Sequence, residues 1–160
     1  MNQKNLAKYL QIVTLGLVLL VAIVYIGAVP GLMSVLLECG AILHKSGVKP
    51  WIIMVWVTAI PVYFSLYHFW KISKEIQADN SFSTENAKHL QAISHLCMLD
   101  VLYFFVANIV FYLLHINGII TLCCTFAIDF IGIVISVLAA ALSHLVYKAA
   151  AMKQENDLTI

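Results

Sequence analysis

The sequence predicts an all-α integral membrane protein, a four-helix bundle with a short interfacial helix after the first span. Of its 160 residues, 62% are hydrophobic and only 11% are charged. A soluble domain has roughly 45–50% apolar and about 25% charged residues. The few charges are clustered, and the uncharged runs between them are long enough to cross a bilayer, which takes about 20 residues. A water-soluble surface cannot be built from this composition.

The first uncharged run begins at Tyr9 and is too long for a single span, and Pro30 divides it. We therefore expect the first span over about residues 9–29. The segment that follows, residues 32–43, is apolar but short and contains Glu38. It fits an interfacial helix or a re-entrant one, and the sequence does not choose between them.

The second span is expected at about residues 50–70. Trp51 and Trp70 lie near its two ends, where indole rings prefer the level of the lipid headgroups. Pro61 lies inside the run, and it is tolerated in membrane helices because neighbouring groups can satisfy the freed carbonyl. A kink is predicted there.

A polar segment, residues 71–95, follows the second span and predicts a cytoplasmic loop with helical ends. Asp79 and Asn80 favour a turn. Ser83 is suited to cap the next helix, and Glu85 then lies in its first turn, where a negative charge is favourable.

The third and fourth spans are expected at about residues 96–115 and 119–147. Asn117 and Gly118 between them are typical of a tight turn, so the two spans form a hairpin. Residues 148–160 then form a polar tail. Since no repeat or linker divides the chain, we treat residues 1–160 as a single membrane domain.

The distribution of lysines predicts that both termini are cytoplasmic, because cytoplasmic flanks of membrane spans carry an excess of positive charge. The chain would cross the membrane four times, and the family resemblance described below implies that this is the bacterial cytoplasmic membrane. Seven lysines would then be inside and two outside. The inside group is Lys4, Lys8, Lys71, Lys74, Lys88, Lys148 and Lys153, and the outside group is Lys45 and Lys49.

Three polar side chains are predicted to lie within the membrane: Asp100 and Asn108 in the third span and Asp129 in the fourth. An ionised carboxylate at the bilayer centre costs about 2.5–3.5 kcal/mol on insertion scales, so these residues should face protein. Counting equally from Asn117 separates the two acids in depth by about five residues, or roughly 7.5 Å. Either they line a proton or cation path, or they are protonated and hydrogen-bond within the bundle. The face of the fourth span that carries its acid is expected to hold Asp129, Gly132, Ser136, Ala140 and Ser143.

The sequence contains no pattern of an enzyme site. There is no nucleophile motif, phosphate-binding glycine loop or metal-ligand spacing, so we expect no enzyme, cofactor or metal site. Direct nucleic-acid binding is not expected either, because arginine is absent and the net charge is only +1. Cys39, Cys123 and Cys124 fall near one membrane face, and whether any of them form a disulfide is left open.

Two polar stretches resemble a known family. Residues 80–90, with the sequence NSFSTENAKHL, resemble the G-x-P-F-T-x-E-N-x-x-x-L signature of the YoaS-like bacterial membrane proteins, a family of unknown function. The ending ENDLTI at residues 155–160 resembles an ending common in that family. Here Asn80 and Ser81 replace the usual glycine-containing turn. The resemblance implies a four-helix bacterial membrane protein, commonly encoded beside a small helix-turn-helix regulator of the Cro/CI type.

These observations lead to a hypothesis of a non-enzymatic regulatory or interaction partner of a cytoplasmic helix-turn-helix transcription factor. The alternative is a small transporter, or an ion or proton channel subunit, that uses the intramembrane carboxylates. The lipid bilayer is the one certain neighbour, and self-association stays open. The expected partner-facing residues are Phe82, Thr84, Glu85, Asn86, Leu90, Glu155, Asn156, Asp157, Leu158, Thr159 and Ile160.

Overall fold

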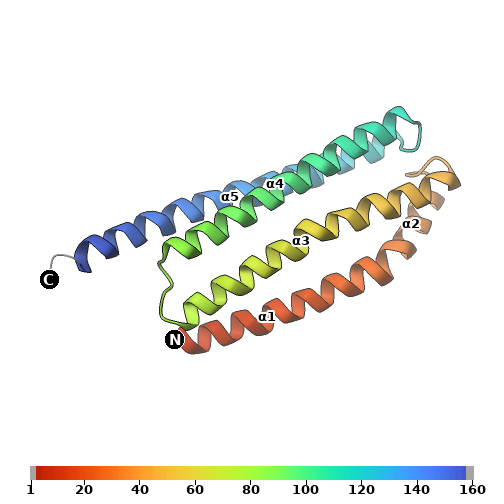
Figure 1. The fold of residues 1–160 in the computed structure, drawn as a ribbon. Helices are drawn as coiled ribbons and strands as arrows, with labels where there is room; N and C mark the ends of the chain where they lie inside the picture. Colours follow the sequence, from red (N-terminus) through yellow and green to blue (C-terminus); the bar gives the residue numbers. More distant parts are fainter. Residues whose placement is uncertain (1–2, 158–160) are drawn as a thin grey trace.

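The computed structural model describes residues 3–157, and in this range the chain folds into four long helical rods (Figure 1). Each rod is long and apolar enough to cross a membrane: Asn5–Glu38, Lys45–Gln77, Thr84–Leu113 and Ile119–Asn156. The predicted all-α, four-helix membrane fold is therefore confirmed. The elements are α1 (Gln3–Ile23), the π-helical η1 (Val24–Ala28), α2 (Val29–Glu38), the 3₁₀-helical η2 (Lys45–Gly47), α3 (Val48–Gln77), α4 (Thr84–Leu113) and α5 (Ile119–Asp157).

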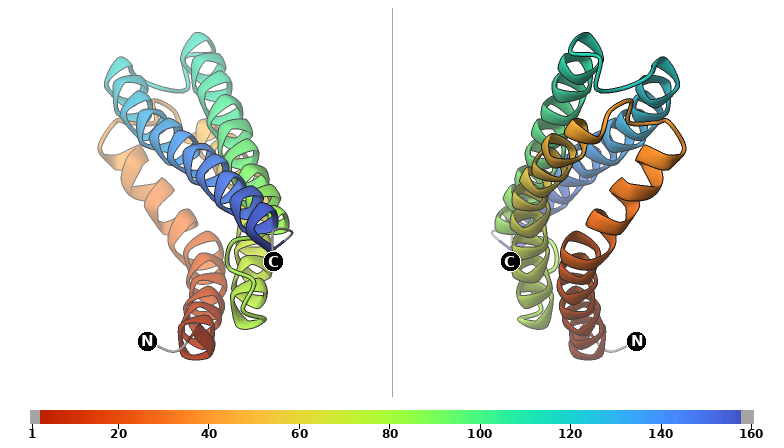
Figure 2. Two further views of the ribbon diagram at one scale, coloured as in Figure 1. Left: turned by 90° about the vertical axis from the view of Figure 1, so that its left-hand side faces the viewer. Right: turned by 90° about the vertical axis from the view of Figure 1, so that its right-hand side faces the viewer.

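Rods that are neighbours in the chain are also neighbours in space. The main packed pairs are α1 with α3, α3 with α4 and α4 with α5. The two end-on views show that the rods are inclined to one another rather than parallel (Figure 2). The start of α1 and the end of α5 lie at the same end of the molecule (Figure 1). We call this the lysine-rich end, and the opposite end, where α4 turns into α5, the hairpin end.

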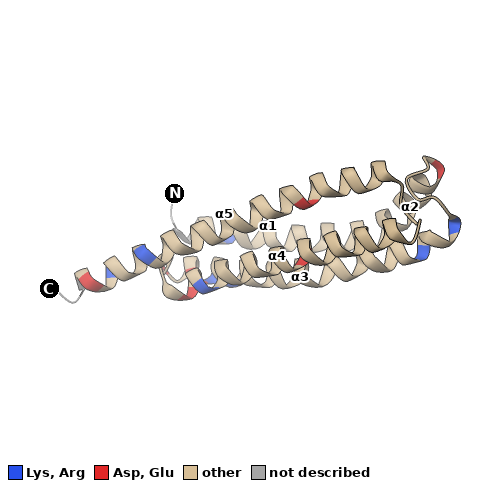
Figure 3. Ribbon diagram, turned by 90° about the horizontal axis from the view of Figure 1, so that it is seen from above, with Lys and Arg blue, Asp and Glu red and all other residues tan. Residues whose placement is uncertain are grey.

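Charge is concentrated at the two ends, and the middle of the rods carries only isolated acidic positions (Figure 3). The rods are also longer than a bilayer requires. Ile119–Asn156 has 38 residues, or about 57 Å at the helical rise, against a hydrocarbon core of about 30 Å. Each rod therefore extends past the core into the headgroup region or the water beyond it.

The first rod differs from the prediction at Pro30. We expected the helix to end there and a separate short helix to follow over residues 32–43. Instead α2 continues the rod to Glu38, with Pro30 in its first turn, and only the residues after Cys39 turn back. The π-helical turn η1 immediately before α2 explains this, because such a bulge loosens the ladder of backbone hydrogen bonds where proline lacks a donor.

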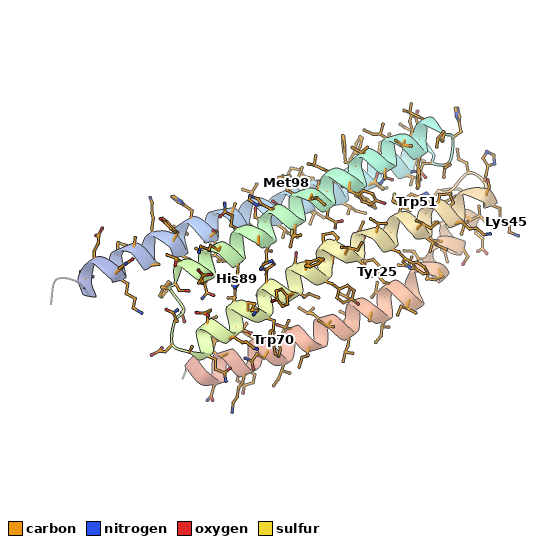
Figure 4. The ribbon with its side chains drawn as sticks, in the orientation of Figure 1. Tyr25, Lys45, Trp51, Trp70, His89 and Met98 are labelled. Carbon is orange, nitrogen blue, oxygen red and sulfur yellow. The ribbon has the colours of Figure 1, made fainter. Side chains whose placement is uncertain are left out.

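Helix α3, which contains the second predicted span, follows the prediction more closely. Trp51 and Trp70 lie toward its opposite ends (Figure 4), and Pro61 is inside it. The helix continues to Gln77, after which Asp79 adopts a positive φ of 62° in the turn. The Ser83 side chain accepts the backbone N–H of Asn86 at 3.1 Å. The predicted cap of the next helix is therefore confirmed.

The hairpin end contains the buried apolar core and a chain of polar contacts. Trp51 Nε1 donates to Asn117 Oδ1 at 2.6 Å, and Asn117 Nδ2 donates to Asn108 Oδ1 at 3.3 Å. The Thr121 hydroxyl donates to the Ala41 carbonyl at 2.7 Å, which fixes the loop after α2 to the start of α5. The core cluster consists of Val29, Met33, Ile42, Trp51 and Met54.

The pair α4 and α5 packs along a regular stripe of small residues. On α4, the positions facing its partners include Ala87, Ser94, Val101 and Asn108, which are buried or half-buried and seven residues apart. On α5 the spacing alternates between three and four residues. This is the repeat of left-handed helix packing. The α5 stripe is Leu122, Thr125, Asp129, Gly132, Ser136, Ala139, Ser143, Val146 and Ala150.

Two details of α5 go beyond the sequence prediction, and the first of them corrects it. The face expected to include Ala140 includes Ala139 instead, and Ala140 is exposed, because the packing repeat is about 3.5 residues rather than 3.6. The polar tail expected from residue 148 onward is helical as far as Asp157. At Gly132 the helices approach so closely that a Cβ atom would collide with the Val101 side chain.

Candidate functional site

The two intramembrane acids line one small cavity. Asp100 from α4, Asp129 from α5 and Thr58 from α3 lie around a space of about 170 Å³. Asp129 is 5% exposed and Asp100 is half-buried. Asp129 is thus enclosed by protein, while Asp100 is only partly covered, and that both acids avoid the lipid stays a prediction.

The acids are closer in depth than the sequence suggested. The Ser94 and Ser136 hydroxyls each donate to the other residue's backbone carbonyl, both at 2.9 Å. Counting equally from Asn117 would instead have placed Ser94 beside Ala140. The reason is that the turn between the helices, residues 114–118, lies mostly on the α4 side of Asn117. The expected five-residue separation was therefore too large.

Each acid has one buried oxygen without a hydrogen-bond partner among the described residues. These are Asp100 Oδ1 and Asp129 Oδ2. A buried acceptor left unpaired costs about 1–3 kcal/mol, and more if it is charged. The cavity is therefore a place where a proton, a cation or another hydrogen-bond donor would be stabilised.

A second, larger cavity of about 300 Å³ lies between α1, α3 and α4, and Asp100 lines it too. Its other walls are almost entirely apolar. The sequence could not show that Pro61 and Ser65 border a space, since this depends on the inclination of α1 against α3. The remaining lining residues are Leu17, Val62, Leu66, Phe69, Ile93, Leu96 and Cys97.

Asn108 does not belong to the acid-lined cavity. It is fully buried, and its Nδ2 donates to the Phe104 carbonyl at 2.9 Å while its Oδ1 accepts from Asn117. The structure thus divides the three polar residues grouped by the sequence. Two acids border a cavity, and the amide joins helices at the hairpin end.

A third cavity lies toward the lysine-rich end, between the first half of α4 and the second half of α5. Its volume is about 420 Å³, and it is bordered by polar side chains. We call it the terminal groove. Lys88 beside it forms an exposed ion pair with Glu85 at 2.7 Å. The side chains that give the groove its polar character are Thr84, Lys88, Gln91, His95, Ser143, His144 and Tyr147.

The expected partner-facing residues have different environments. Phe82 is 57% exposed, and Thr84, Glu85, Glu155 and Asn156 are exposed as well. Leu90 is half-buried. The side chain of Asp157 and all of Leu158, Thr159 and Ile160 lie outside the described residues.

Asn86 differs from the expectation. It is 2% exposed, and its Nδ2 donates to the Ser81 carbonyl at 2.9 Å and to the Asn80 carbonyl at 3.3 Å. Its side chain therefore holds the loop before α4 in place instead of facing a partner.

Comparison with known proteins identifies the family. The family described as "Protein of unknown function (DUF2975)" matches residues 2–160. The chain belongs to this family. It is also 37% identical, over 113 residues, to the "Uncharacterized membrane protein YoaS" of Bacillus subtilis (strain 168), a match that covers 68% of this chain and 69% of that protein. No solved structure matches the chain.

The family assignment confirms the predicted membership of the YoaS-like family. Together with four helices able to span a bilayer, it establishes this DUF2975 chain as a multi-pass membrane protein. The descriptions of the family and of its relative name no activity, so the function has to be argued from the site.

One side-chain pair was not anticipated from the sequence. His68 on α3 and His89 on α4 approach each other, with 3.0 Å between their Nδ1 atoms, and His89 is labelled beside α4 in Figure 4. Within residues 3–157 no group of three potential metal ligands is found. The pair therefore serves as an inter-helix hydrogen bond. The four cysteines are unpaired in this structure.

Proposed function

We propose that this membrane protein is a non-enzymatic interaction protein that binds a small cytoplasmic helix-turn-helix regulator at its lysine-rich end. The observation that carries the proposal is the length of α5. Its 39 residues span about 58 Å, and its last turns extend beyond the other rods at that end (Figure 1). A lipid-facing role alone does not require this extension.

The chemistry of the lysine-rich end supports protein binding. Phe82 exposes an aromatic ring on the loop before α4, and exposed aromatic residues are common anchors of protein interfaces. The terminal groove beside it offers hydrogen-bond donors from Lys88, Gln91 and His95. The excess of lysines supports a cytoplasmic location for this end, where a transcription factor would be met.

Binding at the membrane would regulate a transcription factor through its location. A regulator held at the bilayer has less access to DNA than a free one, and release from the membrane protein would restore that access. No chemical step is needed for this function, and we propose that the protein performs none.

Site-specific crosslinking tests the proposal. A photo-crosslinking amino acid is introduced at Phe82, and in a matched control at Lys45 of the hairpin end, in cells that also produce a tagged small helix-turn-helix regulator of the Cro/CI type. We expect a crosslink to the regulator from position 82 and none from position 45. Equal crosslinking from both positions, or none from either, would contradict the proposal.

A truncation gives a second measure of the same interaction. A chain that ends after Met152 lacks the projecting end of α5 but keeps the spanning part of all four rods. We expect it to reach the membrane at normal abundance and to capture less regulator from a detergent extract. Unchanged capture would show that the end of α5 takes no part.

A second candidate function is supported by the acid-lined cavity. Two carboxylates from different rods, each with an unpaired buried oxygen, are suited to carry a proton or a cation across the bilayer. Purified protein in liposomes should then transport either a cation or protons across the bilayer. Asp100→Asn or Asp129→Asn should abolish it, and Glu38→Gln at the exposed hairpin end should not. Flux that persists in both Asn variants would exclude the acids as carriers.

A further inference from the structure

We propose that the two cavities that share Asp100 in their walls together form a binding site for a hydrophobic ammonium ion, a small molecule with an apolar body and a primary or secondary amine. The ammonium group would lie between the two acids, and the apolar body would fill the larger cavity. The proposal extends the second candidate function by naming its ligand class. It concerns binding, and so it also holds if nothing is transported.

The acid-lined cavity supplies the site for the charged group. Asp129 is 5% exposed, so its side chain is almost completely withdrawn from the surroundings, yet its Oδ2 has no partner within the described structure. On the facing helix, Asp100 Oδ1 is likewise buried and has no hydrogen-bond partner within the described structure. The two carboxyl groups come from two rods and line one space, and a group with positive charge and N–H donors would be stabilised between them.

The larger cavity supplies the site for the apolar body. Its volume of about 300 Å³ is at the lower end of small-molecule sites, which are roughly 300–1,000 Å³ and mostly apolar with a few polar groups. The one acidic residue in its wall is Asp100, which also borders the smaller cavity. A ligand with one charged end and one apolar end matches this division.

The surroundings of the acids disfavour an inorganic cation. A hard cation such as Ca²⁺ takes about six to eight oxygen ligands. Besides the two acids, the side-chain oxygen in the wall of the smaller cavity is that of Thr58, which already donates to the Val55 carbonyl at 2.6 Å and shares a hydrogen bond with Tyr25 at 2.8 Å. An ammonium group needs few acceptors because it donates at most three hydrogen bonds.

The free acceptors also distinguish between amines. A quaternary ammonium ion has charge but no N–H, and so it would form no hydrogen bonds with the carboxyl groups of Asp100 and Asp129. A neutral alcohol of the same shape has a donor but no charge. The site is therefore expected to prefer a protonated primary or secondary amine over both.

The test measures binding of tritiated phenethylammonium to the full-length protein in lipid nanodiscs by scintillation proximity. We expect saturable binding that unlabelled phenethylammonium displaces. The N,N,N-trimethyl derivative and 2-phenylethanol should compete roughly 10- to 100-fold less well, the factor for losing hydrogen bonds to a charged group. Absence of saturable binding, or equal competition by the alcohol, would overturn the proposal without any variant being needed.

Variants then locate the site. Asp100→Asn and Asp129→Asn should each weaken binding roughly 10- to 100-fold, while Asp100→Glu should retain part of it and Glu38→Gln all of it. Ser65→Leu, which fills the apolar cavity and changes no charge, should also weaken binding. Unchanged binding in both Asn variants would refute the site. Binding without proton or cation flux in liposomes would keep the site and reject transport, and regulator crosslinking at position 82 is unaffected by either result.

Discussion

Replacing Asn117 by alanine should destabilise the hairpin end by more than the loss of one side chain suggests. The Asn117 amide accepts from the Trp51 indole N–H and donates to Asn108 Oδ1, so it joins α3, α4 and the turn into α5. All three side chains are buried, with 4% of Trp51, 0% of Asn108 and 1% of Asn117 exposed. Water therefore cannot replace the missing amide.

The size of the effect follows from the groups left behind. Removing the amide leaves one buried donor and one buried acceptor unpaired, at a cost of about 1–3 kcal/mol each. Hydrogen bonds between membrane helices average only about 0.6 kcal/mol, because the unfolded chain in the bilayer finds other partners. We expect the cost of about 1–3 kcal/mol per unpaired group to apply here, because the contacts are fully enclosed. The predicted loss in the free energy of unfolding is therefore about 2 kcal/mol or more.

Unfolding by sodium dodecyl sulfate in mixed micelles, followed by circular dichroism, measures this loss. Trp51→Phe keeps the aromatic packing and removes the N–H, so the double variant with Asn117→Ala should be less destabilised than the sum of the single variants. Asn117→Asp keeps an acceptor for the indole and should be intermediate. A loss under about 0.5 kcal/mol, or strict additivity, would refute the reasoning, because contacting partners should couple by more than that.

Three further substitutions test the packing and the caps, each by the same unfolding measurement. Gly132→Ala should destabilise the α4–α5 pair, because overpacking against the stiff Val101 side chain costs about 1–3 kcal/mol and outweighs a helix-propensity gain of at most about 1 kcal/mol. Ser83→Ala should cost about 0.5–2 kcal/mol by removing the α4 cap, with Ser83→Thr as the conservative control. Thr121→Val should cost about 0.5–1.5 kcal/mol by freeing the Ala41 carbonyl, and faster proteolysis of the preceding loop would accompany it.

Much of the fold could be predicted from the sequence because the bilayer imposes a simple rule. Helices must be long and apolar, and charges must lie at their ends. Ser83 could be placed because capping depends only on a few adjacent residues. In contrast, the sequence predicts that the first helix ends at Pro30. It does so wrongly, because the compensating π-helical turn at Val24–Ala28 has no sequence signal of its own.

The candidate site was predicted in part. Asp100 and Asp129 could be singled out because acids within a span are costly. Their common cavity could not be predicted, because it depends on how many residues of the turn lie on each side of Asn117. The burial of Asn86 was missed for a related reason. An asparagine beside an exposed loop can face outward or fold back onto it, and only the positions of the Asn80 and Ser81 carbonyls decide this.

The α4–α5 hairpin has a consequence for the biogenesis of the protein. Inserted alone, each of these helices would expose a carboxyl group to lipid, at about 2.5–3.5 kcal/mol for an ionised acid at the bilayer centre. The two helices are joined by a short turn, and in the hairpin Asp129 is covered by protein. Inserting both helices together therefore has a lower free-energy cost than inserting each one alone. After the first two rods have been inserted, the translocation machinery would therefore release α4 and α5 into the lipid together, as a pair.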